Sequence, residues 1–208
     1  MLERTVYFAG PSGTGKTTLI GNLLKNDSIY IAGNQEKLDR VGHVRNKIES
    51  EKDYSQTFKY AIGKIDERFQ EAKHHLRLQK DNPEKIILGD RCLHDTISYL
   101  CAATRHGDLT EEEQEKLLKY QTEIYSKESM PKNIIFVDLP LDHIKAYLKK
   151  RWESETKGFR EDQEEYLRIV SDSFRDHFRS VKDFLWIKDP KEFNVDNIDS
   201  WIKQKIKS

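Results

Sequence analysis

The sequence predicts an α/β fold: a parallel five-stranded sheet flanked by helices, with a short lid segment. Short apolar runs alternate along the chain with longer segments of helical apolar period, which is the pattern of a parallel sheet covered on both faces. A glycine-rich loop joins the first apolar run to the first helical segment. The length of 208 residues suits one domain, residues 1–208, and no internal repeat or low-complexity linker divides it.

The predicted strands are the short apolar runs. The run at Ile86-Ile87-Leu88 is continuous and brief, as in a strand that is buried on both faces of a parallel sheet. Gly33 closes the second run and Pro140 follows the fourth, and both residue types favour the end of a strand. The predicted strands are residues 4–9, 28–33, 85–90, 133–138 and 184–187.

The predicted helices fill the intervals between these strands. Apolar residues between Phe58 and Leu76 recur at close to a helical period, and Asp81-Asn82-Pro83 ends this long helix. Thr110 with Glu113 has the spacing of a capping box that opens another helix. The predicted helices are residues 15–26, part of 35–50, 54–80, 94–104, 110–127, 141–152, 162–180 and 195–207.

The glycine-rich loop matches the pattern G-x-x-x-x-G-K-[ST] at every fixed position, between a strand and a helix. Its glycines let successive backbone N–H groups and the helix N-terminus point at one anion. Lys16 would reach the β- and γ-phosphates, and the Thr17 hydroxyl would bind Mg²⁺. The alternative is a plain turn before a capped helix, and the complete match disfavours it. The sequence therefore predicts a three-layer P-loop NTPase fold that binds ATP and Mg²⁺. The predicted nucleotide-binding residues are Gly10, Ser12, Gly13, Thr14, Gly15, Lys16, Thr17 and Thr18.

An aspartate and an arginine, Asp90 and Arg91, close the third apolar run. Because ligands of open α/β sheets bind beyond the carboxyl ends of the strands, we expect both residues near the phosphate loop. Asp90 can hold Mg²⁺ together with Thr17. Arg91 can bind an anionic or sugar group of a phosphate acceptor through charge-assisted hydrogen bonds. An ordinary surface ion pair after a strand is the alternative interpretation.

The stretch from Asp90-Arg91 through Asp95 to Tyr99 resembles the D-R-x-x-x-S-x-x-Y region of thymidylate kinases and the E-R-S region of deoxynucleoside kinases. The resemblance covers about residues 4–182. It implies a P-loop kinase that transfers the γ-phosphate of ATP to a nucleoside or a nucleoside monophosphate. The chain departs from both families at Gly33-Asn34-Gln35-Glu36, where they have a proline-containing turn.

The resemblance also nominates residues that bind the acceptor. Thymidylate kinases carry an Asp-Arg pair on the long helix, and Glu67-Arg68 occupies a comparable place here, which implies that Arg68 faces an acceptor phosphate. Phe69 could stack on the acceptor base or belong to the core. A hydroxyl acceptor would need a carboxylate base, for which Glu36 and Asp90 are the candidates. A phosphate acceptor would instead need the cations Arg68 and Arg91, and the sequence does not choose between the two.

A basic stretch covers the end of the helix predicted over 141–152 and the residues after it. Lys149-Lys150-Arg151 and Lys157-Gly158-Phe159-Arg160 are similar to the lid of the same kinases, and we place the lid at about residues 150–161. Phosphoryl transfer spreads negative charge over the transferred group, so cations that close over it stabilise the transition state. Arg151 and Arg160 are the predicted catalytic cations, with Lys16, Asp90 and Arg91, because a guanidinium matches phosphate bidentately. A solvated charged surface is the alternative.

Composition restricts the partners and the compartment. Lys and Arg together number 36, as do Asp and Glu, so the net charge is zero and nucleic acid or a membrane surface is an improbable partner. No signal-peptide pattern or membrane-spanning apolar run occurs, and the two cysteines have no disulfide or zinc spacing, so we expect a cytoplasmic protein.

His74 and His75 are interpreted as surface residues. Related kinases are commonly dimers through long helices, so residues 54–80 and 94–104 are a candidate homodimer interface.

Two other functions fit a phosphate loop. One is a P-loop ATPase or regulatory switch that acts on a macromolecular partner. The other is a kinase for another small molecule or for nucleic-acid ends. The lid-like basic segment within the same chain favours the nucleoside or nucleotide kinase.

Overall fold

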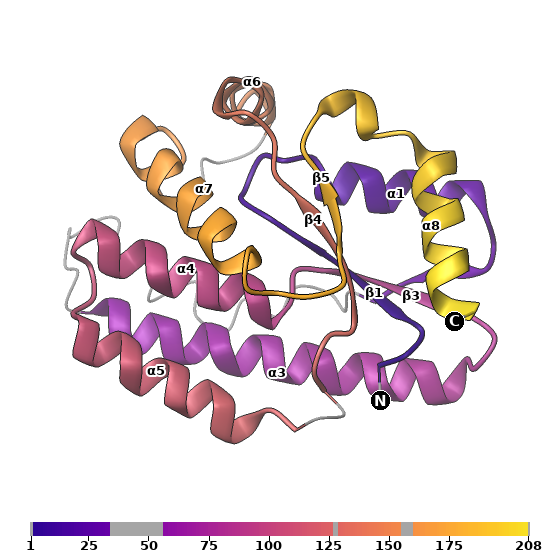
Figure 1. Ribbon diagram of the computed structural model, residues 1–208, viewed down its shortest axis with the longest axis horizontal. Coiled ribbons are helices and arrows are strands. Elements are labelled where there is room, and N and C mark those ends of the chain that lie inside the picture. Colours follow the sequence, from indigo (N-terminus) through magenta and orange to yellow (C-terminus); the bar gives the residue numbers. More distant parts are fainter. Residues whose placement is uncertain (1, 34–55, 127–128, 155–159, 208) are drawn as a thin grey trace.

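The computed structural model describes residues 2–33, 56–126, 129–154 and 160–207. It confirms the predicted fold class, because a parallel sheet of five strands lies between two layers of helices (Figure 1). The strand order is β2-β3-β1-β4-β5, so the first strand of the chain lies in the middle of the sheet. Both β3 and β4 are hydrogen-bonded to β1, and their carboxyl ends therefore meet at the end of β1.

Every strand lies within the apolar run that predicted it. The register pairs Phe8 of β1 with Asp90 of β3, and Ala9 of β1 with Phe136 of β4. Asp90 is thus the last residue of its strand and stands beside the point where β1 enters the glycine-rich loop. The strands are β1 Thr5–Ala9, β2 Tyr30–Ala32, β3 Ile86–Asp90, β4 Asn133–Val137 and β5 Leu185–Ile187.

The helices also follow the prediction, with differences at their ends. The helix that Thr110 caps ends at Ile124, because Tyr125 takes up extended backbone angles. The helix predicted to include part of 35–50 lies outside the described residues. A short 3₁₀ helix, Pro190–Glu192, was not predicted, and Asp189 caps it. The helices are α1 Lys16–Asn26, α3 Thr57–Asp81, α4 Leu93–His106, α5 Glu111–Ile124, α6 Leu141–Arg151, α7 Glu164–Phe178 and α8 Val195–Lys207.

The two faces of the sheet carry separate apolar cores. On one face, side chains of β1, β3 and β4 pack against α1, α6 and α8. On the other face, Tyr7, Ile134 and Phe136 pack against α3, α4 and α7, and α5 lies outside this layer against α3 (Figure 1). Because both faces are covered, the strands read as continuous apolar runs instead of alternating ones.

His75 is not a surface residue, so that prediction was wrong. The residue is 2% exposed, and its ring connects β1 to the residue that follows β2: Nε2 lies 2.9 Å from the Gly33 carbonyl oxygen, and Nδ1 lies 2.8 Å from the Tyr7 hydroxyl. A carbonyl only accepts, so Nε2 carries the proton and the Tyr7 hydroxyl donates to Nδ1. Burial lowers the pKa of His75 to about 4, so the ring is neutral at neutral pH.

Two further observations concern the cysteines and the helices. Cys92 is buried and Cys101 half-buried, and both are free thiols whose pKa burial raises. Among the helices in the described ranges, none combines the length and the apolar character needed to cross a bilayer.

Candidate phosphoryl-transfer site

The glycine-rich loop connects β1 to α1 at the middle of the sheet. Gly10 has a φ of 141°, and a Cβ there would lie 2.3 Å from the carbonyl oxygen of Val137, so only glycine fits between β1 and β4. Gly13 has a φ of 78°, and its Cβ would lie 2.7 Å from Leu148 Cγ of α6. Close approach of β4 and α6 therefore shapes the loop, in addition to the turn itself.

Lys16, the first residue of α1, folds back over this loop. Its ammonium donates to the carbonyl oxygens of Gly10 at 2.9 Å and Pro11 at 2.7 Å, and to Thr14 Oγ1 at 3.1 Å. The residue is 5% exposed, and burial together with the charge of Arg91 lowers its pKa to about 7. An anion held by the loop would stabilise the charged ammonium, as expected for a lysine that binds phosphates.

Thr17 and Asp90 meet across the end of the sheet. The Thr17 hydroxyl donates to Asp90 Oδ2 at 2.9 Å. Burial opposes ionisation of Asp90, but the nearby charges of Lys16 and Arg91 outweigh it and lower the pKa of this carboxyl. An ionised carboxylate and a hydroxyl are hard oxygen donors of the kind that Mg²⁺ takes, together with waters and substrate phosphates. In the described ranges no cluster of three or more His, Cys, Asp or Glu side chains offers an all-protein metal cage.

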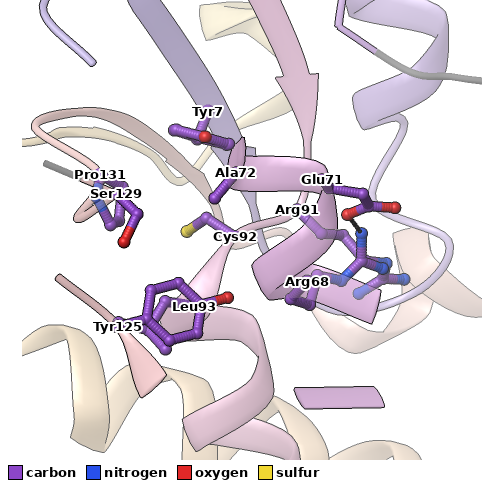
Figure 2. A pocket seen from close by; sticks show the side chains of 10 residues that line it. All are labelled: Tyr7, Arg68, Glu71, Ala72, Arg91, Cys92, Leu93, Tyr125, Ser129 and Pro131. Atoms are coloured by element: carbon purple, nitrogen blue, oxygen red, sulfur yellow. Dashed lines mark hydrogen bonds and ion pairs between the residues drawn. The ribbon is translucent and has the colours of Figure 1, made fainter. Parts of the chain in front are cut away.

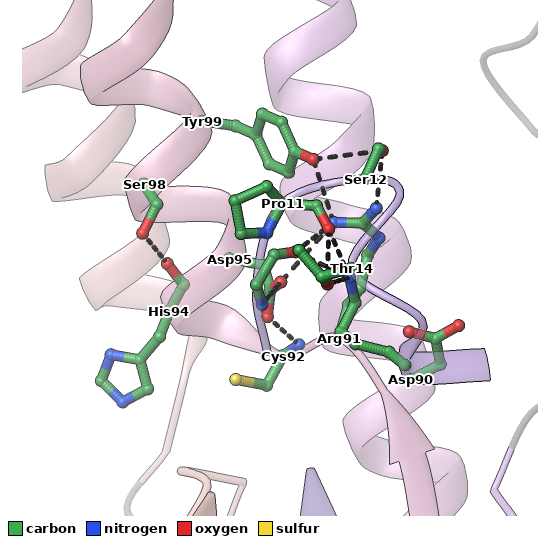
Figure 3. Close-up of polar contacts among 12 residues, drawn as sticks. Pro11, Ser12, Thr14, Asp90, Arg91, Cys92, His94, Asp95, Ser98 and Tyr99 are labelled. Atoms are coloured by element: carbon green, nitrogen blue, oxygen red, sulfur yellow. Dashed lines mark hydrogen bonds and ion pairs between the residues drawn. The ribbon is translucent and has the colours of Figure 1, made fainter. Parts of the chain in front are cut away.

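Arg91 has a left-handed backbone with a φ of 73°, which is uncommon for a residue with a side chain. Its guanidinium lies against the phosphate loop, where Nη2 donates to Ser12 Oγ at 3.1 Å (Figure 3). Nη1 donates to the Tyr99 hydroxyl at 3.2 Å and lies 3.4 Å from the Gly10 carbonyl oxygen. The structure thus joins Arg91 to the loop, near which the sequence placed it, in addition to the acceptor contact that the sequence suggested.

Two residues of α4 complete this network, and the sequence-based selection of site residues missed them. Asp95 is 1% exposed and accepts hydrogen bonds from the backbone N–H of Gly10 at 3.0 Å and of Cys92 at 2.8 Å. Tyr99, one turn later, contacts Ser12 Oγ at 3.4 Å as well as Arg91. The available signal for Asp95 was its position in the first turn of a helix. An acidic residue there predicts the cap contact with the Cys92 N–H, but it does not predict the contact with the Gly10 N–H.

Arg151, at the end of α6, belongs to the same end of the sheet. Leu148 of that helix touches Gly13, and the charge of Arg151 is one of the causes that lower the pKa of Lys16. The Arg151 guanidinium pairs with Glu161, which also accepts from Trp152 Nε1 at 3.3 Å. This contact joins the end of α6 to the turn before α7, across the predicted lid; Lys157 and Gly158 lie outside the described residues.

Arg160 has a different environment from the one the sequence suggested. It is 7% exposed, pairs through both terminal nitrogens with Asp108, and lies against the ring of Tyr166, 5.4 Å from its centroid. Nη1 is also 2.7 Å from His106 Nδ1. The predicted position over the phosphates is replaced here by a buried ion pair at the α4–α5 turn, because the buried Asp108 carboxylate requires a cation.

A pocket lies behind the Asp90-Arg91 turn, between α3, α4 and the end of α5. Figure 2 shows Arg68, Glu71 and Arg91 on one side of it, and Tyr125 and Ser129 on the other. Arg68 pairs with Glu71, and its Nη1 lies 3.4 Å from the Asp90 carbonyl oxygen.

Phe69, the predicted stacking residue, packs beside this pocket. Its ring centroid is 5.3 Å from that of Tyr125, with the planes tilted by 57°, and Lys73 Nζ lies 4.9 Å from its centroid. Tyr125 itself lines the pocket. Glu36, the remaining predicted acceptor residue, lies outside the described residues.

Comparison with known proteins identifies a family and a shared fold. A family model described as deoxynucleoside kinase matches residues 6–206. Three solved structures of the deoxyadenosine kinase from M. mycoides are similar over 98% of this chain at 16% identity. The structure with dCTP has a TM-score of 0.70 over 98% of that chain, the one with dATP 0.70 over 99%, and the one with the products dCMP and dCDP 0.68 over 98%. At this identity the likeness shows a shared fold. No curated protein matches the sequence.

Proposed function

The chain belongs to the deoxynucleoside kinase family, and we propose that it transfers the γ-phosphate of ATP to the 5′-hydroxyl of a nucleoside. The observation that carries this proposal is the position of Arg91. Its guanidinium touches Ser12 and Gly10 of the phosphate loop, and the same residue lines the pocket behind the Asp90-Arg91 turn. A phosphate donor on the loop and an acceptor in the pocket would therefore meet at Arg91.

The residues around the loop supply the electrostatic part of the reaction. In phosphoryl transfer the protein mainly positions the reactants and stabilises charge that spreads over the transferred group. In this proposal Lys16 binds the β- and γ-phosphates, and Arg91 and Arg151 neutralise the transferred phosphoryl group. Thr17 and Asp90 would hold Mg²⁺, which when bound neutralises charge on the donor phosphates.

Pairing of the charges on the acceptor side supports a hydroxyl acceptor. Arg68, which the sequence assigned to an acceptor phosphate, is paired with the Glu71 carboxylate on the same helix. A phosphate beside this pair would be repelled by the carboxylate, whereas a neutral nucleoside would not. The M. mycoides enzyme, for which dCMP is a product, points in the same direction. A carboxylate base would then accept the hydroxyl proton, and Glu36 is the better candidate because Asp90 is bound to Thr17.

Assays of ATP consumption with Mg²⁺, against a panel of nucleosides and nucleoside monophosphates, test this function. We expect a nucleoside to stimulate ATP consumption and a 5′-monophosphate to accumulate in equal amount. Stimulation by monophosphates alone would overturn the nucleoside assignment and return Arg68 to an acceptor phosphate. Slow hydrolysis that no acceptor accelerates would instead support the P-loop ATPase alternative.

A further inference from the structure

One buried carboxylate connects the phosphate loop to the Asp90-Arg91 turn. Asp95 Oδ1 accepts from the backbone N–H of Gly10 at 3.0 Å and lies 3.5 Å from Arg91 Nη1. Its second oxygen, Oδ2, accepts from the N–H of Cys92 at 2.8 Å (Figure 3). A single side chain therefore holds the first residue of the loop, the guanidinium of Arg91 and the first turn of α4.

We propose that Asp95 is a positioning residue for phosphoryl transfer, which holds Arg91 and the start of the phosphate loop in one fixed arrangement. The proposal rests on the proposed kinase activity for its kinetic consequence, but the arrangement itself can be measured without a substrate. The D-R-x-x-x-S pattern that this stretch resembles has serine at this position. A serine has one oxygen on a shorter side chain and could not bridge the same groups.

The burial and charge of the site explain why a carboxylate is needed. Asp95 is 1% exposed, and a buried carboxylate is stable only when it is paired and hydrogen-bonded. Its location in the first turn of α4 places it at the positive end of the helix dipole, which favours its charge. An amide in its place would direct an N–H₂ group at a backbone N–H, so one of the two backbone donors would lose its acceptor.

Arg91 requires such support because its own backbone conformation is unfavourable. A left-handed φ of 73° costs free energy that the surroundings must offset. Asp95 and Tyr99 hold its guanidinium from successive turns of α4, and Tyr99 also contacts Ser12. Without these contacts the guanidinium would sample other rotamers, and a misplacement of about 1 Å can lower a rate roughly a hundredfold.

The kinetic test is a cycle of four proteins: the wild type, Asp95→Asn, Arg91→Ala and the double variant. We expect Asp95→Asn to lower kcat about 10- to 100-fold in the wild type, with the KM for ATP changed less than about threefold. In the Arg91→Ala background the same change should lower kcat by a clearly smaller factor, because only the contact with the Gly10 N–H is then left to lose. An equal loss in both backgrounds would show that Asp95 does not act through Arg91 and would overturn the proposal.

A second variant covers the case in which Asp95→Asn does not fold. Tyr99→Phe removes only a hydroxyl and keeps the ring, whose centroid is 5.1 Å from that of Phe174. It should lower kcat in the wild type by a larger factor than when Arg91 is already alanine, because only the contact with Ser12 is then left to lose. The matched control is Asp199→Asn. Asp199 is another largely buried carboxylate; it lies on α8, accepts a hydrogen bond from the Tyr30 hydroxyl of β2 and pairs with Lys203 of α8. It should lower stability and leave kcat near that of the wild type.

Hydrogen exchange provides a readout that needs no catalysis. The Gly10 amide should exchange at least about tenfold faster in Asp95→Ala, which removes both acceptor oxygens, while the amides of β1 keep their protection. Unchanged exchange at Gly10 would overturn the proposed contact. If the wild type phosphorylates no nucleoside, the proposed function fails by itself, and exchange at Gly10 then decides whether Asp95 holds the loop.

Discussion

The Thr17 hydroxyl donates to Asp90 Oδ2 at 2.9 Å, although the two residues are 73 positions apart. The contact arises because α1 begins where β1 ends, and because β3 pairs with β1 so that Asp90 lies beside Phe8. A hydroxyl and an ionised carboxylate are thereby placed together at the end of the sheet. This pair is the structural basis for the proposed Mg²⁺ site.

Removing the Thr17 hydroxyl should weaken the response to Mg²⁺. We expect Thr17→Val to raise the Mg²⁺ concentration for half-maximal activity roughly tenfold or more, because a ligand and its hydrogen bond to Asp90 are lost together. Thr17→Ser keeps the hydroxyl and should stay near the wild type. Titration of activity with Mg²⁺ at saturating ATP measures the change. Equal behaviour of the valine and serine variants would exclude Thr17 as a ligand.

Lys16→Ala should lower kcat by roughly 100-fold or more while the protein stays folded, because it removes a charge that stabilises the transition state. The side chain contacts loop carbonyls instead of the apolar core, so the thermal midpoint should change little. The matched control is Lys25→Ala, at the exposed end of the same helix. Turnover of Lys16→Ala at the wild-type rate would contradict the assignment of the whole loop.

Replacing Arg160 should affect stability strongly. Arg160→Leu leaves the buried Asp108 carboxylate without its arginine partner, and losing one member of a buried ion pair costs about 3–5 kcal/mol. Arg105→Leu removes the exposed pair with Asp176 and should cost less than about 1 kcal/mol. Urea unfolding of both variants measures the difference. Equal small losses would show that Asp108 does not depend on Arg160, and would favour the lid role that the sequence suggested.

A buried histidine, His75, and a half-buried one, His94, should make the protein less stable in acid. Burial lowers the pKa of His75 and of His94 to about 4, below the usual value of 6.5 in an unfolded chain. The unfolded state therefore binds more protons between these values. Each histidine contributes stability that is complete above pH 6.5 and is lost as the pH falls toward 4, by at most about 1.4 kcal/mol per pH unit.

Urea unfolding between pH 7.5 and pH 5 checks this expectation. His75→Gln should show a shallower loss of stability with falling pH than the wild type, because one titrating group is gone. The exposed His143 provides the control, and His143→Gln should keep the wild-type slope. A slope unaffected by His75→Gln would mean that this ring is not held neutral by burial.

The alternation of apolar runs was sufficient to predict the sheet, because each strand needs only a short run of residues such as Ile86-Ile87-Leu88 to be buried on both faces. The contacts of polar side chains were not predictable in the same way. His75 was expected at the surface, yet it binds Tyr7, which lies 68 positions earlier in the chain. Asp95 was noted only as part of the stretch that resembles a kinase motif, and its partner Gly10 is 85 positions away.

The sequence by itself predicted the phosphate loop, because the spacing of the glycines, Lys16 and Thr17 can be recognised without the contacts from β4 and α6 that also shape the loop. It also placed Asp90 and Arg91 at a strand end. Only the tertiary structure decided which cations approach that loop. Arg91 lies against Ser12, while Arg160 is bound to Asp108 at the α4–α5 turn. A buried charge must be paired with an opposite charge. Which partner is available depends on tertiary packing between residues far apart in the chain.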